Sequence, residues 1–226
     1  MNGQLRPAEE RAAAYAHVYF VNGTGYAGKS TLVKALAEKY DGILCGENYH
    51  DALLPELDRA EFPNLCYTRD LADWRDFVRR TPEEYEAWII GVTKECETLE
   101  LRILTELAKQ DRPVFVDTNI SPETLRQISD DRHVLILLAD PEVSVRRFFE
   151  REDREKQFLY RLLLEEPDPE AALENFRACL SRVNSRENYA AFLRSGFPVL
   201  LRDEGRSPGE TLALAEKSFR LREAEE

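Results

Sequence analysis

Three glycines, a lysine and a serine lie close together near the beginning of the chain, in the stretch VYFVNGTGYAGKST. Gly23, Gly25 and Gly28 have the G-x-G-x-x-G spacing of a turn that binds dinucleotides. The same glycines, followed by Lys29 and Ser30, also match G-x-x-x-x-G-K-S, whose backbone N–H groups surround the phosphates of a nucleoside triphosphate. The stretch therefore predicts a nucleotide site of one of these two kinds.

Two acidic residues farther along the chain help to choose between the two kinds of site. Glu47 follows the second apolar run, about where a dinucleotide fold places the carboxylate that holds a ribose. Asp117 ends the run PVFV, where a triphosphate site needs an acid for its Mg²⁺ ion. A dinucleotide site would leave Lys29 and Asp117 without a function, so we favour the triphosphate.

The triphosphate interpretation gives most residues of the glycine loop a task. The backbone would hold the phosphates, Lys29 would stabilise their charge, and Ser30 would bind Mg²⁺ together with Asp117. The predicted ATP-binding residues are Gly23, Thr24, Gly25, Tyr26, Ala27, Gly28, Lys29, Ser30 and Thr31. Tyr26 is unusual in such a loop, and nothing in the sequence explains it.

A cluster of arginines follows the fourth apolar run. In LADPEVSVRRFFEREDREK, Arg147, Arg151 and Arg154 have spacings of four and three, which predicts one face of a helix. Arginines at a ligand crevice stabilise the negative charge of a phosphoryl group during transfer, so we predict that these three are catalytic. Acidic residues are interleaved with them, and a solvated helix face is the alternative.

Candidates for activating an acceptor lie directly after the second apolar run. In CGENYHD, Glu47 is the first candidate for a general base and Asp51 the second. Either carboxylate could instead cap the following helix. His50, between them, is interpreted as an ordinary polar loop residue.

The segment RDLADWRDFVRR offers further acceptor-binding candidates. Arg69 and Arg75 could bind an anionic acceptor, and Trp74 could stack on a flat one. Trp74 is at helical spacing from Leu71 and Phe77, however, and that pattern is more typical of a core residue. A phosphate acceptor needs arginines whereas a hydroxyl acceptor needs a base, and the sequence offers both.

These residues must be positioned by short apolar runs that alternate with helical patterns. The runs are 17–21, 42–45, 113–116, 133–139 and 197–201. Strands that are apolar throughout and separated by helices predict an α/β fold with a parallel sheet covered on both faces. Thr81, Asp140 and Ser207 each precede a proline and predict helix starts. Residues 46–110 predict a helical insertion over the sheet edge, and residues 1 to about 14 a frayed or helical lead-in.

The composition predicts one soluble, cytoplasmic domain over residues 1–226. The net charge of −12 argues against a nucleic-acid surface, because phosphate backbones need a basic face. No stretch is apolar for long enough to cross a bilayer, and the first residues are too charged for a signal peptide. The four cysteines lack metal-ligand spacing, which predicts reduced, partly buried thiols. We expect a monomer or homodimer whose partner is a small-molecule acceptor, with neither nucleic acid nor a membrane.

The glycine loop, the strand-terminal Asp117 and the arginines after LLADPE together resemble the small P-loop kinases. This group includes nucleoside-monophosphate kinases, deoxynucleoside kinases and shikimate kinases. The resemblance implies a three-layer P-loop NTPase fold, with a five-stranded parallel sheet in the order 2-3-1-4-5 and a mobile lid near residues 148–170.

The same resemblance implies roles for individual residues. Arg147 would pack on adenine, Arg151 would meet the phosphates, and LLRDEGRSP at 200–208 would be the other loop that lines adenine. Glu47 stands where deoxynucleoside kinases have their base. The insertion 46–110 is longer than in most nucleotide kinases, and TNIS after the third run matches no subgroup.

We therefore expect a Mg²⁺-ATP-dependent kinase that acts on a small metabolite, nucleoside or nucleotide. A nucleotide-binding switch or scaffold that meets a protein partner is the alternative, and an NAD-dependent oxidoreductase is a remote one. The acceptor and the preference for ATP over GTP stay open.

Overall fold

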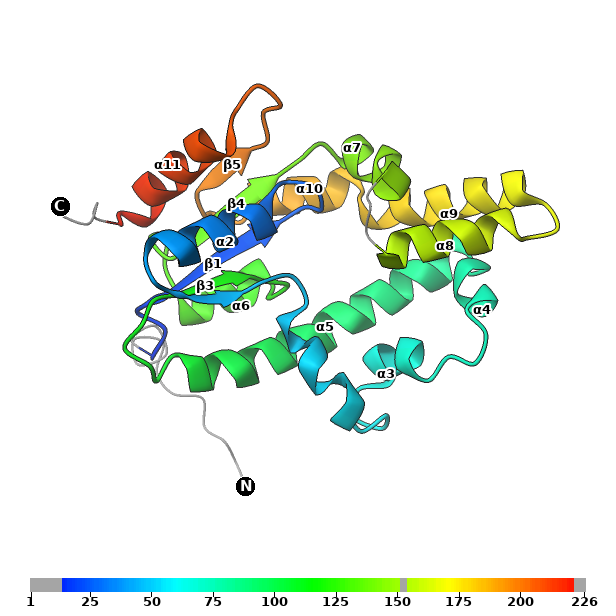
Figure 1. Cartoon of the computed structure of the whole chain (residues 1–226), viewed down its shortest axis with the longest axis horizontal. Coiled ribbons are helices and arrows are strands. Elements are labelled where there is room, and N and C mark those ends of the chain that lie inside the picture. The colour runs from blue at the N-terminus through cyan, green and yellow to red at the C-terminus, as the bar shows by residue number, and fades with distance from the viewer. Residues whose placement is uncertain (1–13, 151–153, 222–226) are drawn as a thin grey trace.

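The computed structural model describes residues 14–150 and 154–221, and its centre is a parallel β-sheet. The strands are β1 (Val18–Gly23), β2 (Ile43–Cys45), β3 (Val114–Asp117), β4 (Val134–Leu138) and β5 (Val199–Leu201). In this described part of the chain, five strands form one sheet in the order β2-β3-β1-β4-β5, with parallel neighbours throughout (Figure 1). The predicted α/β class and strand order are confirmed. The lead-in predicted over residues 1 to about 14 lies almost entirely outside the described residues.

Helices cover both faces of the sheet, which gives the three expected layers (Figure 1). One face is covered by α2 (Lys29–Lys39) and α11 (Pro208–Phe219), and the other by α5 (Pro82–Leu107), α6 (Pro122–Ile128) and α10 (Arg186–Leu193). Successive side chains of a strand point to opposite faces. Phe20 of β1 therefore packs with α5 and α6, while Val21 packs with α2 and α11. Because both of their faces are covered, the central strands β1, β3 and β4 are largely buried, whereas the edge strands β2 and β5 each expose a leucine.

The helix starts predicted from proline and its preceding residue are present in the structure. Thr81 accepts a hydrogen bond from the Glu84 N–H at 3.2 Å, and the Glu84 carboxylate accepts one from the Thr81 N–H at 2.9 Å. Ser207 and Glu210 make the same reciprocal pair at the start of α11. Asp140 accepts from the N–H of the residue after the proline, at the start of α7 (Pro141–Arg146). These caps satisfy N–H groups that have no partner within the helix.

The predicted insertion 46–110 is helical, and part of it forms a lobe with the segment predicted as a lid. The insertion contains η1 (Tyr49–Glu56), α3 (Pro63–Arg69), α4 (Arg75–Val78) and α5. The lid segment contains η2 (Phe148–Glu150) and α8 (Arg154–Leu164), which leads into α9 (Pro169–Val183). Helices α8 and α9 pack against α4 and the first half of α5, around Phe77, Tyr85, Leu163 and Phe176 (Figure 1). We call α3, α4, the first half of α5, α8 and α9 the helical lobe.

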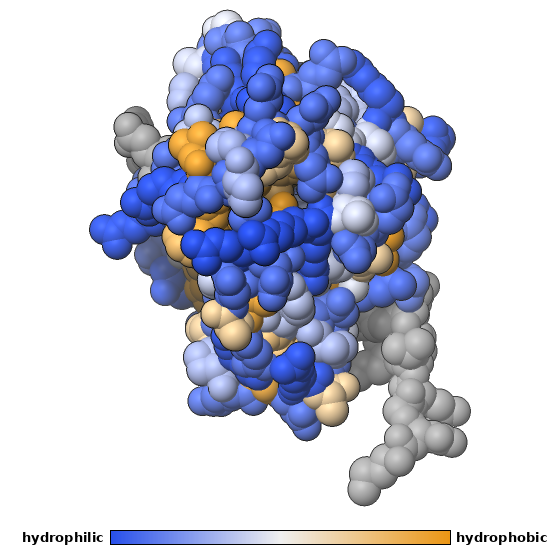
Figure 2. All heavy atoms as spheres, turned by 90° about the vertical axis from the view of Figure 1, so that its right-hand side faces the viewer, coloured by the Kyte–Doolittle hydropathy of each residue, from blue (hydrophilic) through white to orange (hydrophobic). Residues whose placement is uncertain are grey.

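The outward side of the helical lobe is mainly hydrophilic (Figure 2). Apolar residues are visible there only in scattered spots, because the larger apolar side chains of the lobe face one another. Among the described residues, no helix combines the length and the apolar character that a membrane crossing requires.

Candidate functional site

The glycine loop between β1 and α2 adopts a backbone that favours glycine at two positions. Gly23 has a φ of 126° and Gly28 has a φ of 95°, a region that side chains disfavour. A Cβ atom on Gly23 would lie 1.8 Å from the Leu137 carbonyl oxygen of β4, so no side chain fits there. Gly28 is the N-cap of α2, and the unpaired N–H groups of a helix N-terminus favour anions.

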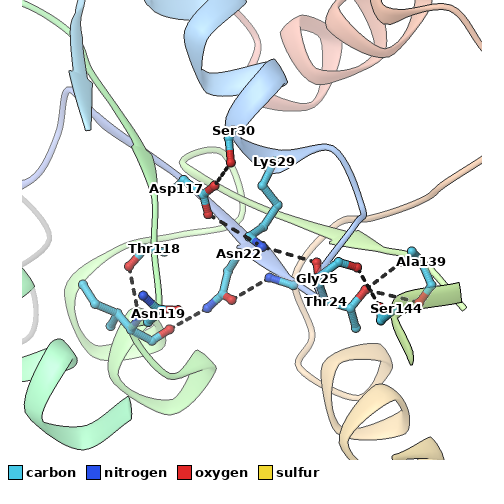
Figure 3. Close-up of polar contacts among 12 residues, drawn as sticks. Asn22, Thr24, Gly25, Lys29, Ser30, Asp117, Thr118, Asn119, Ala139 and Ser144 are labelled. Atoms are coloured by element: carbon cyan, nitrogen blue, oxygen red, sulfur yellow. Dashed lines mark hydrogen bonds and ion pairs between the residues drawn. The ribbon is translucent and has the colours of Figure 1, made fainter. Parts of the chain in front are cut away.

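Hydrogen bonds hold this loop against the end of β4 and the start of α7 (Figure 3). The Thr24 hydroxyl accepts from the Ala139 N–H at 2.7 Å and donates to the Ala139 carbonyl at 3.2 Å. The Ser144 hydroxyl of α7 donates to the Gly25 carbonyl at 3.0 Å. These bonds engage a carbonyl and a side chain of the loop from outside and connect the loop to β4 and α7.

Tyr26, which the sequence left unexplained, ties the loop to two other segments. Its hydroxyl donates to the Arg147 carbonyl at 3.0 Å, and its own carbonyl accepts from the Arg202 guanidinium. Its backbone has a φ of 61°, which costs about 1–2 kcal/mol for a residue other than glycine. The two hydrogen bonds offset this cost and connect the loop to the residues after β4 and β5.

Lys29, Ser30 and Asp117 meet where β1 and β3 end beside the start of α2 (Figure 3). The Ser30 hydroxyl donates to Asp117 Oδ2 at 2.7 Å, and Lys29 Nζ lies 3.7 Å from Asp117 Oδ1. Lys29 Nζ also donates to the Thr24 carbonyl at 3.2 Å. The pKa of Asp117 is raised, chiefly because the carboxylate is buried. The Lys29 ammonium and the hydrogen bond from Ser30 act in the opposite direction, whereas the Glu47 and Glu100 carboxylates raise this pKa further.

This arrangement has the donor set that a magnesium–phosphate complex needs. Mg²⁺ prefers oxygen ligands and is commonly held by one or two protein groups, with phosphate and water completing its shell. The Ser30 hydroxyl and the Asp117 carboxylate are two such groups, only 2.7 Å apart. The Lys29 ammonium lies beside them and can neutralise phosphate charge.

A cavity of about 240 Å³ adjoins the glycine loop on the side of β5. Ala27 and Gly28 of the loop line one wall, and Leu200, Arg202 and Arg206 line the opposite wall. Its volume is somewhat below the range for small-molecule pockets, which begins at about 300 Å³. Residues 200–208, which border this cavity, are the segment for which the resemblance to the small P-loop kinases implies a contact with adenine.

Glu47 and Asp51 lie near the end of β2, beyond Asp117. Both carboxylates are exposed, and Asp51 lies 3.6 Å from His50 Nε2. Burial raises the pKa of Asp51, and the neighbouring His50 lowers it. The alternative that either residue caps η1 is wrong, because Asn48 is the N-cap and no side chain among the described residues caps this helix.

The other acceptor candidates make contacts of their own within the insertion and the helical lobe. Arg69 donates to the carbonyls of Leu54 and Leu57 at 3.0 and 2.8 Å, which fixes the end of η1. Arg75 pairs with Glu165 at 3.7 Å. The Trp74 ring is partly buried and packs edge-on to Phe77 and Phe158, 5.6 and 5.7 Å between centroids, against the apolar centre of the helical lobe.

The prediction that Arg147, Arg151 and Arg154 share one helix face is wrong. Helix α7 ends at Arg146, Arg147 is its C-cap, and Arg154 begins α8. The helix ends because Phe148 and Phe149 turn toward Phe176 of α9, with ring centroids 5.8 and 6.0 Å away. Arg147 instead pairs with Glu204, 3.2 Å away, at the rim of the cavity described above. Arg151 lies outside the described residues.

A buried polar cluster beside Asp117 escaped the sequence analysis. The Glu100 carboxylate of α5 has no exposed surface and accepts from the Thr118 hydroxyl at 2.6 Å and from the Asn119 side-chain amide at 3.0 Å. His50 Nδ1 lies 3.5 Å from the same carboxylate, and His50 Nε2 lies 3.2 Å from Cys96 Sγ. The interpretation of His50 as an ordinary loop residue is therefore wrong, since only 2% of it is exposed.

One signal in the sequence could have revealed this cluster. Glu100 follows Leu99 and precedes Leu104 on the apolar stripe of a long amphipathic helix, where a carboxylate needs hydrogen-bond donors. The donors come from TNIS, the segment after β3 that matched no subgroup of kinases. All four cysteines are free and buried, as predicted.

No protein-family model matches the chain, and no curated protein matches it in sequence. Its function must therefore be argued from the geometry and chemistry of the site.

Proposed function

We propose that this protein is a Mg²⁺-ATP-dependent phosphotransferase of the P-loop kinase type that acts on a small-molecule acceptor. The observation that carries the proposal is the contact of Ser30 and Lys29 with Asp117, behind a glycine loop that opens a helix. A dinucleotide turn has no use for a lysine and a hydroxyl gathered around a buried carboxylate. A magnesium–triphosphate complex uses all three groups.

In this proposal each group of the site has a separate task. The N–H groups of residues 23–30 bind the phosphates, Lys29 neutralises their charge, and Ser30 and Asp117 hold the metal ion. Bound Mg²⁺ supplies charge neutralisation and orientation of the phosphates. The nucleobase occupies the cavity between the loop and Arg202. Arg147 and Arg154 lie at the entry of the lid segment, where closure would exclude water that hydrolyses ATP.

Magnesium-dependent nucleotide binding tests this proposal. Calorimetry should show that Mg²⁺ tightens ATP binding to the protein, and that Ser30→Ala and Asp117→Asn remove most of this effect of Mg²⁺. ADP release should then rise above basal hydrolysis when an acceptor is present. If the protein binds ATP but no acceptor raises the rate of ADP release, the switch or scaffold alternative is favoured. Binding of NADH in place of ATP would refute the proposal.

A further inference from the structure

Tyr26 connects the glycine loop to two segments that lie far from it in the sequence. Its hydroxyl donates to the carbonyl of Arg147, the C-cap of α7, at 3.0 Å. Its own carbonyl accepts a hydrogen bond from the guanidinium of Arg202, the residue after β5. The φ of Tyr26 is 61°, and residues held in such disfavoured conformations are frequent at functional sites. One loop residue therefore reaches both the chain after β4 and the chain after β5.

A third contact joins these two segments to each other. Arg147 Nη2 donates to Glu204 Oε1 at 3.2 Å, and Glu204 lies two residues after Arg202 in the turn between β5 and α11. Tyr26, Arg147 and the turn 202–204 thus form a closed ring, in which each segment contacts the other two. A shift of any one segment disturbs its contacts with both others, so the ring holds each of them more firmly than a single contact would.

The turn is the side of this ring that is attached to the sheet. The Arg202 N–H donates to the Leu138 carbonyl at the end of β4, at 2.7 Å. The Gly205 N–H donates to Asp203 Oδ1 at 2.9 Å, which fixes the turn internally. The position of Arg147 therefore depends on its contacts with the glycine loop and with an anchored turn.

The ring borders the cavity of about 240 Å³ that adjoins the glycine loop. Arg202 and Glu204 line this cavity, and so does Ala27, the residue after Tyr26. The Arg147 guanidinium, paired with Glu204, is held at the rim. A guanidinium donates its hydrogen bonds in its own plane, so a carboxylate partner leaves its flat faces able to stack on an aromatic ring.

We propose that Tyr26 is a positioning residue, which fixes Arg147 so that its guanidinium stacks on a nucleobase bound in the cavity. This inference rests on the proposed function. Tyr26 holds the backbone of Arg147, and Glu204 holds its guanidinium. Base binding then depends on a residue of the loop that binds the phosphates, although the phosphates themselves do not need the Tyr26 hydroxyl.

Paired ligands separate the nucleobase from the phosphates. Dissociation constants for ATP and for inorganic tripolyphosphate, each with Mg²⁺, are measured by calorimetry for the unchanged protein and for Tyr26→Phe. We expect Tyr26→Phe to raise the constant for ATP by about threefold to tenfold, the usual contribution of one hydrogen bond, and to leave that for tripolyphosphate unchanged. Tyr40→Phe removes a hydroxyl that bonds Glu216 at 3.0 Å, at the far end of α2, and is the matched control that should change neither constant.

A double variant shows whether Tyr26 acts through the guanidinium. Arg147→Ala keeps the carbonyl that Tyr26 contacts but has no side chain to position, so it should weaken ATP binding and leave tripolyphosphate binding unchanged. In the Arg147→Ala protein, adding Tyr26→Phe should then have no further effect on ATP binding. Glu204→Gln should weaken ATP binding with the same selectivity.

Two results would overturn the inference. If Tyr26→Phe leaves both constants unchanged, or raises both by the same factor, the residue does not act on the nucleobase. If Tyr26→Phe weakens ATP binding as strongly in the Arg147→Ala protein as in the unchanged one, it does not act through Arg147. Failure of the unchanged protein to bind either ATP or tripolyphosphate would instead remove the proposed function.

Discussion

Replacing the buried Glu100 by glutamine should damage both the stability of the fold and the proposed metal site. The carboxylate accepts from the Thr118 hydroxyl at 2.6 Å, the Asn119 N–H at 3.1 Å and the Asn119 side-chain amide at 3.0 Å. Glutamine has one oxygen and one NH₂ group, so in either orientation at least one of these donors faces another donor. Hydrogen bonds to charged groups contribute about 1.5–3 kcal/mol each. The loss of one such bond, or of two with partial relaxation of the surrounding groups, should therefore lower the free energy of unfolding by about 2–4 kcal/mol.

Urea denaturation measures this loss of stability. For a slope of about 2–3 kcal/mol/M, the midpoint of unfolding should fall by roughly 1 M. Glu97→Gln is the matched control on the same helix, because Glu97 accepts from the Ser121 N–H at 2.8 Å, away from Asp117. We expect Glu100→Gln alone to weaken Mg²⁺-dependent ATP binding, by about tenfold, which corresponds to about 1.4 kcal/mol. If Glu97→Gln weakens that binding equally, or Glu100→Gln changes neither property, our account of this cluster is incorrect.

Three further predictions concern the loop, a helix cap and the thiols. Gly23→Ala should lower the free energy of unfolding by about 3 kcal/mol or more in urea melts, because the added Cβ would overlap Leu137. Gly25→Ala is the control and should cost much less, because the nearest atom to its added Cβ is 3.8 Å away. Thr81→Ala should lower the free energy of unfolding by about 1 kcal/mol by removing the cap of α5, and no loss would contradict the capping box. Burial raises the thiol pKa of both Cys45 and Cys96 to about 12, so at pH 8 these thiols stay protonated and should not react with a disulfide reagent until the protein unfolds. Rapid reaction of the native protein would show that they are accessible.

The strands and most helix starts could be predicted because their signals are local. A strand buried on both faces is apolar throughout, and a cap such as Thr81 or Ser207 needs only residues within one turn. The glycine loop was equally local, since its spacing already brought Lys29 and Ser30 to the start of a helix. Asp117 could be added because the parallel strands β1 and β3 end at the same edge of the sheet.

Other features depend on contacts between residues far apart in the sequence. The end of α7 at Arg146 is set by Phe148 and Phe149 packing on Phe176, a partner that local helix propensity does not reveal. Whether Arg75 could serve an acceptor depended on where the lobe places it, and its partner Glu165 is ninety residues away. Periodicity placed these residues on helices but did not determine what each side chain contacts.

The most direct test of the central claim, that the glycine loop is a triphosphate site, is a comparison of ATP affinities. The dissociation constant for ATP in the presence of Mg²⁺ is measured for the unchanged chain and for Lys29→Ala. A hydrogen-bonded charge pair with a phosphate is worth about 1.5–3 kcal/mol, so the dissociation constant should rise by about tenfold to a hundredfold. Lys34→Ala, a change to an exposed lysine on the same helix, should leave the constant unchanged. Equal affinities for the unchanged protein and Lys29→Ala would contradict the assignment of the glycine loop as the triphosphate site.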